Sequence, residues 1–340
     1  MKEKVYFYTG NNEASKSILS YNLLIKKKLN TYKVIASNKL KKNSINIIME
    51  GFDKKQYQEI LKNKNKNFKV ILIITEFLDP KLKTFNSFDK KKNFSLKYFF
   101  FYTLIYIYQL LKLNDSNWFK KIYNSSKLRK KLSTFHSVEL AKDVIRHKKR
   151  FIYFEEILKI SSLVYCSHEK IRKDLKKYYS KKSYLIFPLL DKINKKKFSN
   201  KIKFSGSLTK YRKSILKNFD INFKNSGFFI NNRNKSYICS LHPKKNFQWL
   251  YSSPIRYIDA ILFGEIPLTT DKFIDNYHNL LSIKLNSKDQ YQFKYNINKY
   301  SLDIKNINNK ISNFNKYIKK DDFNGKIKLK QIIQNVKKNI

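Results

Sequence analysis

The sequence predicts an α/β protein built on parallel β-sheets. Short β-prone runs alternate with segments of helical spacing along most of the chain, which is typical of strands joined by crossover helices. The run Val70–Thr75 is apolar up to its last residue, as expected of a strand that is covered on both faces. At roughly 150 residues per domain, a length of 340 residues predicts two domains.

Residues 1–190 carry the predicted elements of an N-terminal domain. The predicted strands are Val5–Thr9, Tyr32–Ile35, Ile45–Ile48, Val70–Thr75, Leu163–Cys166 and Tyr184–Phe187. The predicted helices cover residues 13–29, 54–62, 94–133, 151–160 and 169–179. Because helices separate most of these strands, the strands can lie parallel in one sheet.

The remaining sequence predicts a linker, a second domain and a helical C-terminus. Residues 191–201 consist mostly of Lys, Asn and Ser, which is a linker composition. A second α/β domain is predicted over 202–303, with strands that begin at Ile202, Tyr237 and Ile266. Residues 304–340 are rich in Lys and Asn, with Ile spaced for one or two amphipathic helices.

The net charge of +48 first suggests a protein that binds nucleic acid. Only seven of the 73 cationic residues are Arg, however, and Arg is the residue preferred for bidentate phosphate contacts. The Lys residues are spread along the chain, and Asn, Ile, Tyr and Phe are enriched with them, as in proteins of genomes rich in A and T. We therefore interpret most of the charge as surface composition, and we do not expect nucleic acid as the main partner.

Composition also predicts a soluble, cytoplasmic protein. No stretch has the roughly 18–20 uncharged apolar residues of a membrane-spanning helix, and Met1–Lys4 leads straight into a predicted strand without a signal peptide. Two cysteines are too few for a disulfide scaffold or a Cys-rich zinc module. Residues 98–111 form an uncharged aromatic run that we interpret as a buried helix. The alternative is peripheral contact with the inner membrane face through this run.

A first candidate binding motif is the Gly206–Ser207 turn between a predicted strand and a predicted helix. Glycine lets the backbone approach a ligand closely, and a helix N-terminus offers free N–H groups to an anion. Turns of this kind are common in proteins that bind nothing there, so the motif alone is weak.

A second and sharper motif lies between Ser252 and Pro267. Ser253 suits the N-cap position and Pro254 the first helical position, so a helix over 254–263 is predicted to direct its positive end at a ligand beside Ser252 and Ser253. Arg256 adds a permanent cation in the first turn. Asp259 follows one turn later, where its carboxylate could accept hydrogen bonds from sugar hydroxyls.

His242 is a further candidate, because it follows the strand that begins at Tyr237 and precedes the helix over 254–263. The carboxyl end of a strand faces the usual ligand crevice of an open α/β sheet. A structural histidine and a ligand contact are equally compatible with this position.

These motifs, in this order, resemble the C-terminal half of GT-B-fold glycosyltransferases, in particular exostosin-like and group-1 type enzymes. The resemblance rests on Gly206–Ser207, on His242–Pro243 and on the pattern Ser-Pro-x-Arg-x-x-Asp-Ala-x-x-x-Gly-x-Ile-Pro from Ser253 to Pro267. It covers about 202–275 well and 151–190 loosely, and only the α/β pattern agrees before 150. The family usually has Glu where this chain has Asp259.

The resemblance implies two Rossmann-like domains facing a cleft. It implies a donor site made of Gly206, Ser207, His242, Ser252, Ser253, Arg256 and Asp259. The co-substrate would be a nucleotide-diphosphate sugar, and the acceptor a polysaccharide, a lipid-linked glycan or another cell-surface glycan. No cofactor and no metal are implied, because the helix and the cations neutralise the leaving diphosphate, and the chain contains no Asp-x-Asp motif.

An inverting enzyme of this class needs a base that activates the acceptor hydroxyl, and the first domain should supply it. The candidates are Glu76, which follows the strand Val70–Thr75, and His136. A retaining enzyme would need neither. Two alternatives to a glycosyltransferase stay open: a nucleic-acid-binding protein that uses its Lys-rich surface, and a scaffold of the same fold without catalysis.

Overall fold

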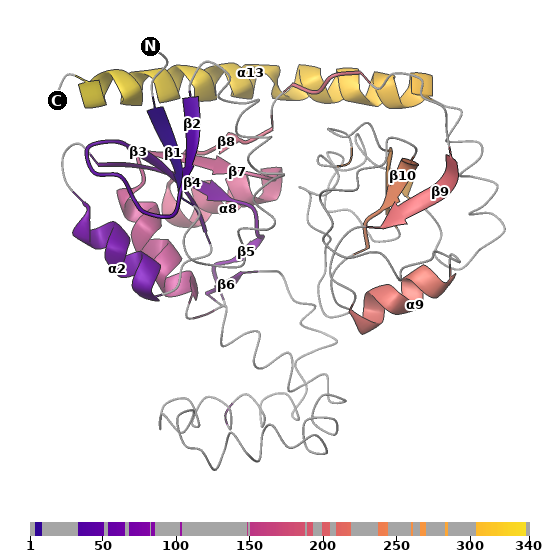
Figure 1. The fold of residues 1–340 in the computed structure, drawn as a ribbon, viewed down its shortest axis with the longest axis horizontal. Coiled ribbons are helices and arrows are strands. Elements are labelled where there is room, and N and C mark those ends of the chain that lie inside the picture. The colour runs from indigo at the N-terminus through magenta and orange to yellow at the C-terminus, as the bar shows by residue number, and fades with distance from the viewer. Residues whose placement is uncertain are drawn as a thin grey trace.

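The computed structural model describes residues 4–8, 33–50, 54–64, 68–81, 83–85, 103, 148, 150–187, 189–192, 199–204, 209–218, 237–243, 260, 266–269, 283–284 and 304–337. These residues form an α/β structure, as the sequence predicts, with a parallel sheet of six strands (Figure 1). The predicted helices 13–29 and 94–133 lie outside the described residues, apart from Thr103, which is helical.

The first sheet has the spatial order β2-β1-β3-β4-β7-β8, and every neighbouring pair is parallel. Its strands are β1 (Lys4–Tyr8), β2 (Lys33–Ser37), β3 (Ile45–Met49), β4 (Lys69–Ile74), β7 (Leu163–Cys166) and β8 (Tyr184–Leu185). The apolar runs of β3, β4 and β7 are buried almost throughout, which confirms that these central strands are covered on both faces.

Helices α2 (Lys54–Lys62) and α8 (Glu169–Tyr179) and the helical residues 150–160 connect the strands of this sheet, all where the sequence predicts them. An aromatic cluster holds the helix over 150–160 in place. Phe151 and Phe154 lie with their ring centroids 5.2 and 5.3 Å from that of Phe85, and all three side chains are fully buried. Phe85 belongs to a short antiparallel pair, β5 (Leu78–Asp79) and β6 (Thr84–Phe85), which the sequence did not predict.

A second parallel sheet has the order β12-β11-β10-β9. It contains β9 (Ser199–Phe204), β10 (Tyr237–Leu241), β11 (Ile266–Thr269) and β12 (Ile283–Lys284), and α9 (Lys210–Asn218) follows β9. Strand β9 begins at Ser199, three residues before the predicted strand start and inside the predicted linker 191–201. The polar residues Ser199–Lys201 read as linker in sequence, yet they belong to β9, and Ser199 pairs with Tyr237 of β10.

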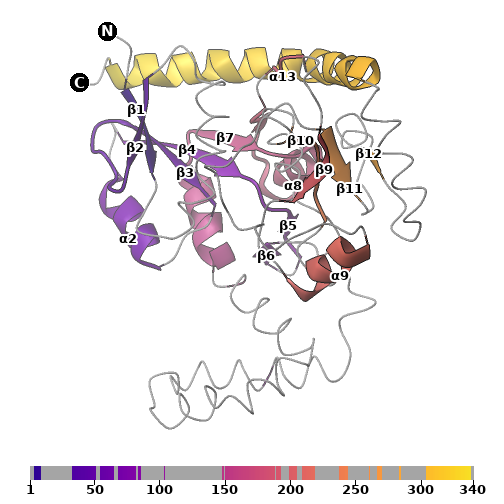
Figure 2. The same cartoon turned by 45° about the vertical axis from the view of Figure 1, so that its right-hand side comes forward.

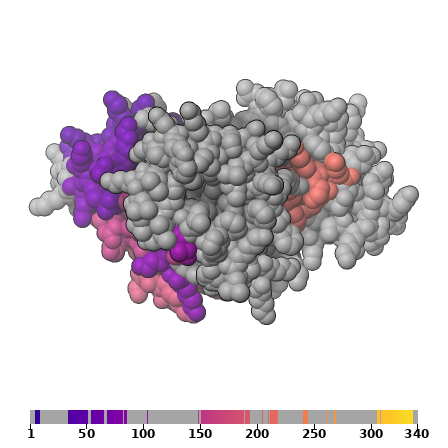
Figure 3. Space-filling view, turned by 90° about the horizontal axis from the view of Figure 1, so that it is seen from below, coloured from indigo at the N-terminus to yellow at the C-terminus, as the bar shows by residue number. Residues whose placement is uncertain are grey.

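The C-terminal segment forms one helix, α13 (Ile304–Lys337), where the sequence allowed one or two. In Figures 1 and 2 this helix runs along one side of the molecule, from the second sheet to the first. Seen from the opposite side in Figure 3, the indigo-to-purple N-terminal elements and α9 in salmon reach the surface, and α13 is not in view.

Helix α13 covers the edge of the first sheet at β8. The Asp321 carboxylate accepts a hydrogen bond from the Leu185 N–H, which points away from β7, and forms an ion pair of 2.6 Å with Arg172 on α8. Asn315 bonds to both the N–H and the C=O of Leu190, each at 2.8 Å. A sheet edge would otherwise present free backbone groups, so side chains of α13 take the place of a further strand.

No helix among the described residues is both long and apolar enough to cross a membrane. The aromatic run 98–111, which the sequence offered as a membrane contact, lies outside those residues except for Thr103.

Candidate functional site

The strand order of the first sheet reverses between β1 and β3, because β2 lies on one side of β1 and β3 on the other. In open α/β sheets the crevice outside the carboxyl ends of the strands at such a reversal is the usual ligand site. Tyr8 ends β1, Glu50 follows β3, and Thr75 and Glu76 follow β4. These residues therefore occupy the edge of the sheet where a ligand is expected.

The Glu50 carboxyl group ties the ends of β3 and β4 together. Its side chain is buried, with the residue 2% exposed. Its Oε1 accepts hydrogen bonds from the Thr75 N–H at 3.1 Å, the Thr75 hydroxyl at 2.6 Å and the Glu76 N–H at 3.0 Å. Its Oε2 is buried without a hydrogen-bond partner among the described residues. These three hydrogen bonds fix the direction in which the chain leaves β4, and with it the position of Glu76.

The environment of Glu50 favours its protonated form. Burial raises the pKa of Glu50 to about 7, and the nearby charge of Glu76 adds to the increase, whereas the Thr75 hydroxyl and Arg150 act in the opposite direction. A proton on this carboxyl group removes the cost of a buried charge. Glu50 is therefore a carboxyl group that gains and loses its proton near neutral pH, next to the backbone of Glu76.

Glu76 lies where the sequence predicts it, directly after β4 at the carboxyl edge of the sheet. Its side chain is 32% exposed, and its Oε1 lies 3.6 Å from Nη2 of Arg150. Arg150, in turn, packs over the ring of Phe85, with 5.1 Å between the guanidinium carbon and the ring centroid. The helix that begins near Arg150 thus brings a cation to the carboxylates at the ends of β3 and β4. Whether Glu76 acts as a base stays a prediction.

The next strand along, β7, contributes residues with structural contacts. The His168 Nδ1 accepts the Lys170 N–H at 2.9 Å and so caps the N-terminus of α8. The hydroxyl of Ser167 donates to the carbonyl oxygen of Thr75 at 3.2 Å. Burial raises the pKa of the Cys166 thiol to about 12, so this thiol stays protonated and is a poor nucleophile.

The carboxyl edge of the second sheet carries a buried cation. Arg212, in the first turn of α9, is 1% exposed; its Nη2 donates to the carbonyl oxygen of Pro243 at 3.2 Å. Its guanidinium carbon lies 5.7 Å from the ring centroid of Phe204, the last residue of β9. Thr209 caps this helix by accepting the Arg212 N–H at its hydroxyl. Because an arginine keeps its charge, permanent positive charge lies at this edge.

His242 also lies at this edge, directly after β10, as the sequence predicts. Its side chain is buried, with Nε2 2.7 Å from the Ser240 hydroxyl oxygen. The backbone N–H of His242 donates to the carbonyl oxygen of Leu268. The contact with Ser240 positions the ring within the sheet. A direct contact between His242 and a donor stays a prediction.

All the other predicted site residues lie outside the described residues. These are His136, Gly206, Ser207, Ser252, Ser253, Arg256 and Asp259. Strand β9 ends at Phe204 and α9 begins at Lys210, before and after Gly206 and Ser207 in the sequence. Ala260, within the predicted helix 254–263, is helical and buried.

Sequence reasoning missed three charged residues at the two edges: Glu50, Arg150 and Arg212. Glu50 carries the same signal that identified Glu76, an acidic residue directly after an apolar strand-like run. Arg212 is one of only seven arginines and falls in the first turn of a predicted helix. Arg150 carries no local signal, because only the folded sheet brings it to Glu76.

Among the described residues no group of three or more His, Cys, Asp or Glu side chains is arranged to hold a metal ion. No protein-family profile, no curated protein and no solved structure matches this chain.

Proposed function

We propose that this chain is a glycosyltransferase that moves a sugar from a nucleotide-diphosphate donor to a glycan or lipid-linked acceptor, without a metal. The proposal assigns the chain a GT-B architecture, in which two Rossmann-like domains face a cleft. The donor binds at the carboxyl edge of the second sheet, and the acceptor at the carboxyl edge of the first.

The observation that carries the proposal is the buried guanidinium of Arg212 at the edge of the second sheet. It lies in the first turn of α9, five residues after Ser207 in the sequence, and the sequence offers Gly206 and Ser207 for a diphosphate. A permanent cation and a helix N-terminus both favour an anionic ligand. Arg212 played no part in the sequence resemblance, so it supports the donor site independently.

The first sheet supports the acceptor side of the proposal. Glu76 is partly exposed at the carboxyl edge, and its backbone is held by Glu50. A carboxylate in this position can accept the proton of an acceptor hydroxyl as the hydroxyl attacks the sugar. Arg150, 3.6 Å from Glu76, places a cation beside this carboxylate at the same edge.

The donor site is tested by isothermal titration of the full chain with UDP, GDP, CDP, ADP and TDP. We expect saturable binding of one or more of these nucleotides. Loss of a charged hydrogen bond costs about 1.5–3 kcal/mol, so Arg256→Ala should weaken binding by about ten- to a hundred-fold. Asp259→Ala should weaken binding of the nucleotides through their ribose. Lys217→Ala, which removes an exposed cation at the other end of α9, is the matched control and should leave the affinity unchanged.

Two results would contradict the proposal. Tight binding of RNA or DNA with a steep dependence on salt, unchanged in Arg256→Ala, would favour the nucleic-acid alternative. If the folded chain binds neither nucleotides nor nucleic acid, the remaining alternative is a scaffold of the same fold without catalysis.

A further inference from the structure

The long helix α13 has two faces of different character. One face packs on the body of the protein through buried side chains at helical spacing, among them Ile311, Phe314, Ile318 and Leu329. The opposite face contains six exposed residues that we call the outer face of α13: Lys316, Lys319, Lys320, Phe323, Ile327 and Lys330. The proposed glycosyl transfer uses none of them.

Specific contacts fix which side of α13 is turned outward. Asp321 is held by Arg172 and the Leu185 N–H, and the carbonyl oxygen of Gly325 accepts the Tyr165 hydroxyl at 3.2 Å. Gly325 also allows a close approach, since a Cβ at this position would lie 3.3 Å from the ring of Tyr165. Helix α13 therefore cannot rotate to bury its outer face without breaking these contacts.

The outer face is positively charged, and the acidic side chains of α13 are engaged away from it. The only acidic residues of α13 are Asp321 and Asp322. Asp321 faces α8 and β8, and Asp322 is buried and paired with Lys326 at 3.1 Å. The exposed lysines thus form an uncompensated basic stripe along the helix.

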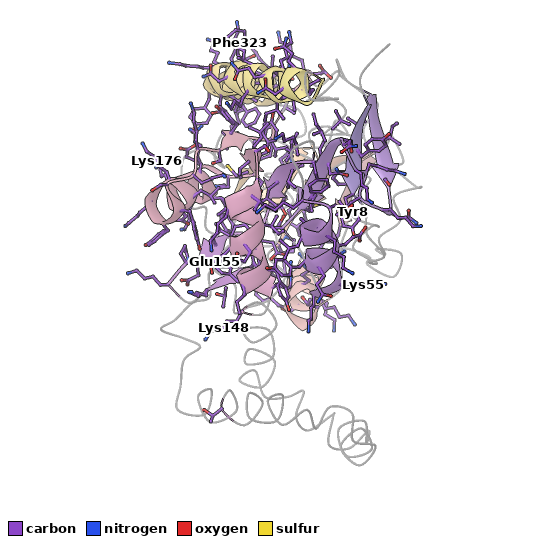
Figure 4. All side chains as sticks on the ribbon, turned by 90° about the vertical axis from the view of Figure 1, so that its left-hand side faces the viewer. Tyr8, Lys55, Lys148, Glu155, Lys176 and Phe323 are labelled. Atoms are coloured by element: carbon purple, nitrogen blue, oxygen red, sulfur yellow. The ribbon has the colours of Figure 1, made fainter. Side chains whose placement is uncertain are left out.

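Two large apolar side chains lie in the middle of this basic stripe. Phe323 is 64% exposed, the highest value among the large hydrophobic residues that the structure describes, and Ile327, one turn later, is 41% exposed. Figure 4 shows Phe323 on the side of α13 that is turned away from the sheets. The series Lys316, Lys320, Phe323, Ile327 and Lys330 advances by four and three residues alternately, which places its members along one side of the helix.

We propose that the outer face of α13 docks on the surface of an anionic lipid bilayer. The lysines match the negative headgroups, and Phe323 and Ile327 enter the boundary between headgroups and acyl chains. A helix of 34 residues is about 51 Å long and lies along one side of the molecule, so it can meet a flat surface along its length. An exposed phenyl ring flanked by an aliphatic side chain favours a lipid surface over a phosphate backbone, which offers no apolar layer.

The test is co-sedimentation of the full chain with vesicles of phosphatidylcholine that contain about 30% phosphatidylglycerol, compared with pure phosphatidylcholine. We expect binding to the anionic vesicles only. The triple variant Lys316→Gln, Lys320→Gln, Lys330→Gln should lower the partition coefficient by about a hundred-fold, at about 1 kcal/mol for each lysine. The matched control removes the same charge from the exposed side of α8, through Lys173→Gln, Lys176→Gln and Lys177→Gln. This control should lower the partition coefficient less than about threefold.

A second pair of variants tests the apolar part of the outer face. Phe323→Ser should lower binding by about tenfold and Phe323→Trp should retain it, because tryptophan is well suited to the interface. Ile152→Ser, which removes another exposed apolar side chain, is the control and should have no effect. Because all these side chains are exposed, the circular dichroism spectrum and thermal midpoint should not change.

Three results would overturn the proposal. They are absence of binding to anionic vesicles, equal losses in the two triple variants, and retention of vesicle binding by the α13 triple variant. If that triple variant lost binding to an RNA oligonucleotide while vesicle binding persisted, the outer face would be a nucleic-acid surface. None of these results depends on nucleotide binding, so the proposed glycosyl transfer can fail or hold separately.

Discussion

Glu50 accepts two hydrogen bonds from Thr75, one from its backbone N–H at 3.1 Å and one from its hydroxyl at 2.6 Å. Both end on the same carboxylate oxygen, at the carboxyl ends of two neighbouring strands, β3 and β4. The buried carboxyl group therefore serves as a fixed point from which the chain continues to Glu76. The charge state of Glu50 couples the stability of this edge to pH.

The raised pKa of Glu50 predicts a specific pH dependence of stability. The pKa is about 7 in the folded protein and 4.5 for an unperturbed glutamate, so the folded chain binds more protons between these values. The stabilising contribution of protonated Glu50 is complete below about pH 4.5 and is lost as the pH rises through about 7. This loss should lower the free energy of unfolding by on the order of 2–3 kcal/mol.

Glu50→Gln isolates this effect, because glutamine keeps an acceptor for Thr75 and does not titrate. We subtract the free energy of unfolding of the wild type from that of the variant, both from urea unfolding. This difference should rise by about 2–3 kcal/mol between pH 5 and pH 7.5. Glu156→Gln, at a half-exposed position on the helix over 150–160, is the control and should follow the wild type. A difference between Glu50→Gln and the wild type that does not change with pH would show that Glu50 titrates normally.

A second prediction concerns the attachment of α13 to the sheet edge. Asp321→Ala removes the partner of the Leu185 N–H and of Arg172, so we expect a loss of about 2 kcal/mol in the free energy of unfolding. Asp321→Asn keeps an acceptor for Leu185 and should lose less. Asp174→Ala, which breaks only the pair with Lys170 within α8, should cost about 0.5 kcal/mol. Equal losses for Asp321→Ala and Asp174→Ala would contradict the role of Asp321 as an edge cap.

A third prediction distinguishes packing from helix propensity at Gly325. In an exposed helix, glycine to alanine gains about 1 kcal/mol, but a Cβ here would lie 3.3 Å from the Tyr165 ring and 3.4 Å from Cβ of Tyr184. Both tyrosines are buried and cannot move aside readily. We therefore expect Gly325→Ala to lower the free energy of unfolding by about 1 kcal/mol. Asn324→Ala, on the exposed side of α13, should raise it by a few tenths of a kcal/mol. A stabilising Gly325→Ala would indicate that α13 packs less closely on β7 and β8.

A fourth prediction concerns Glu76 as the base of an inverting transfer. Glu76→Gln should lower kcat by about a hundred- to ten-thousand-fold and leave donor affinity unchanged, because a general base contributes by this amount in the chemical step only. Glu155→Gln, on the helix that begins near Arg150, should retain activity. If the Glu76→Gln variant stays active and the product keeps the anomeric configuration of the donor, the enzyme is a retaining one. The transfer then needs no base, and the prediction for Glu76 is wrong.

Much of the fold follows from local sequence. Helices α2 and α8 and strand β7 have the predicted bounds, and β11 begins at the predicted residue, because an apolar pattern and clear ends mark each of them. Strands β5, β6 and β12 have only two residues each, which is too short to show any periodicity. Gly325 in the middle of the C-terminal segment suggests a break between two helices, yet it is the residue that lets one long helix pack against Tyr165.

The candidate site was predictable only in part. Glu76 and His242 could be placed because each directly follows a strand-like run. The pairing of Glu76 with Arg150 joins residues 74 positions apart in sequence, and the burial of Arg212 depends on Pro243 in another loop. Such contacts follow from the strand order and the crossover helices, and no local pattern encodes them.

The central claim is that the chain consumes a nucleotide sugar. The most direct measurement is the release of nucleoside diphosphate by the full chain from a panel of UDP-, GDP-, CDP-, ADP- and TDP-sugars, with and without mixed glycan acceptors. We predict that at least one donor releases its diphosphate, faster with an acceptor, and that Arg256→Ala lowers this release by about ten- to a hundred-fold when the donor is limiting. Absence of release from every donor, together with absence of nucleotide binding to the folded chain, would contradict the claim.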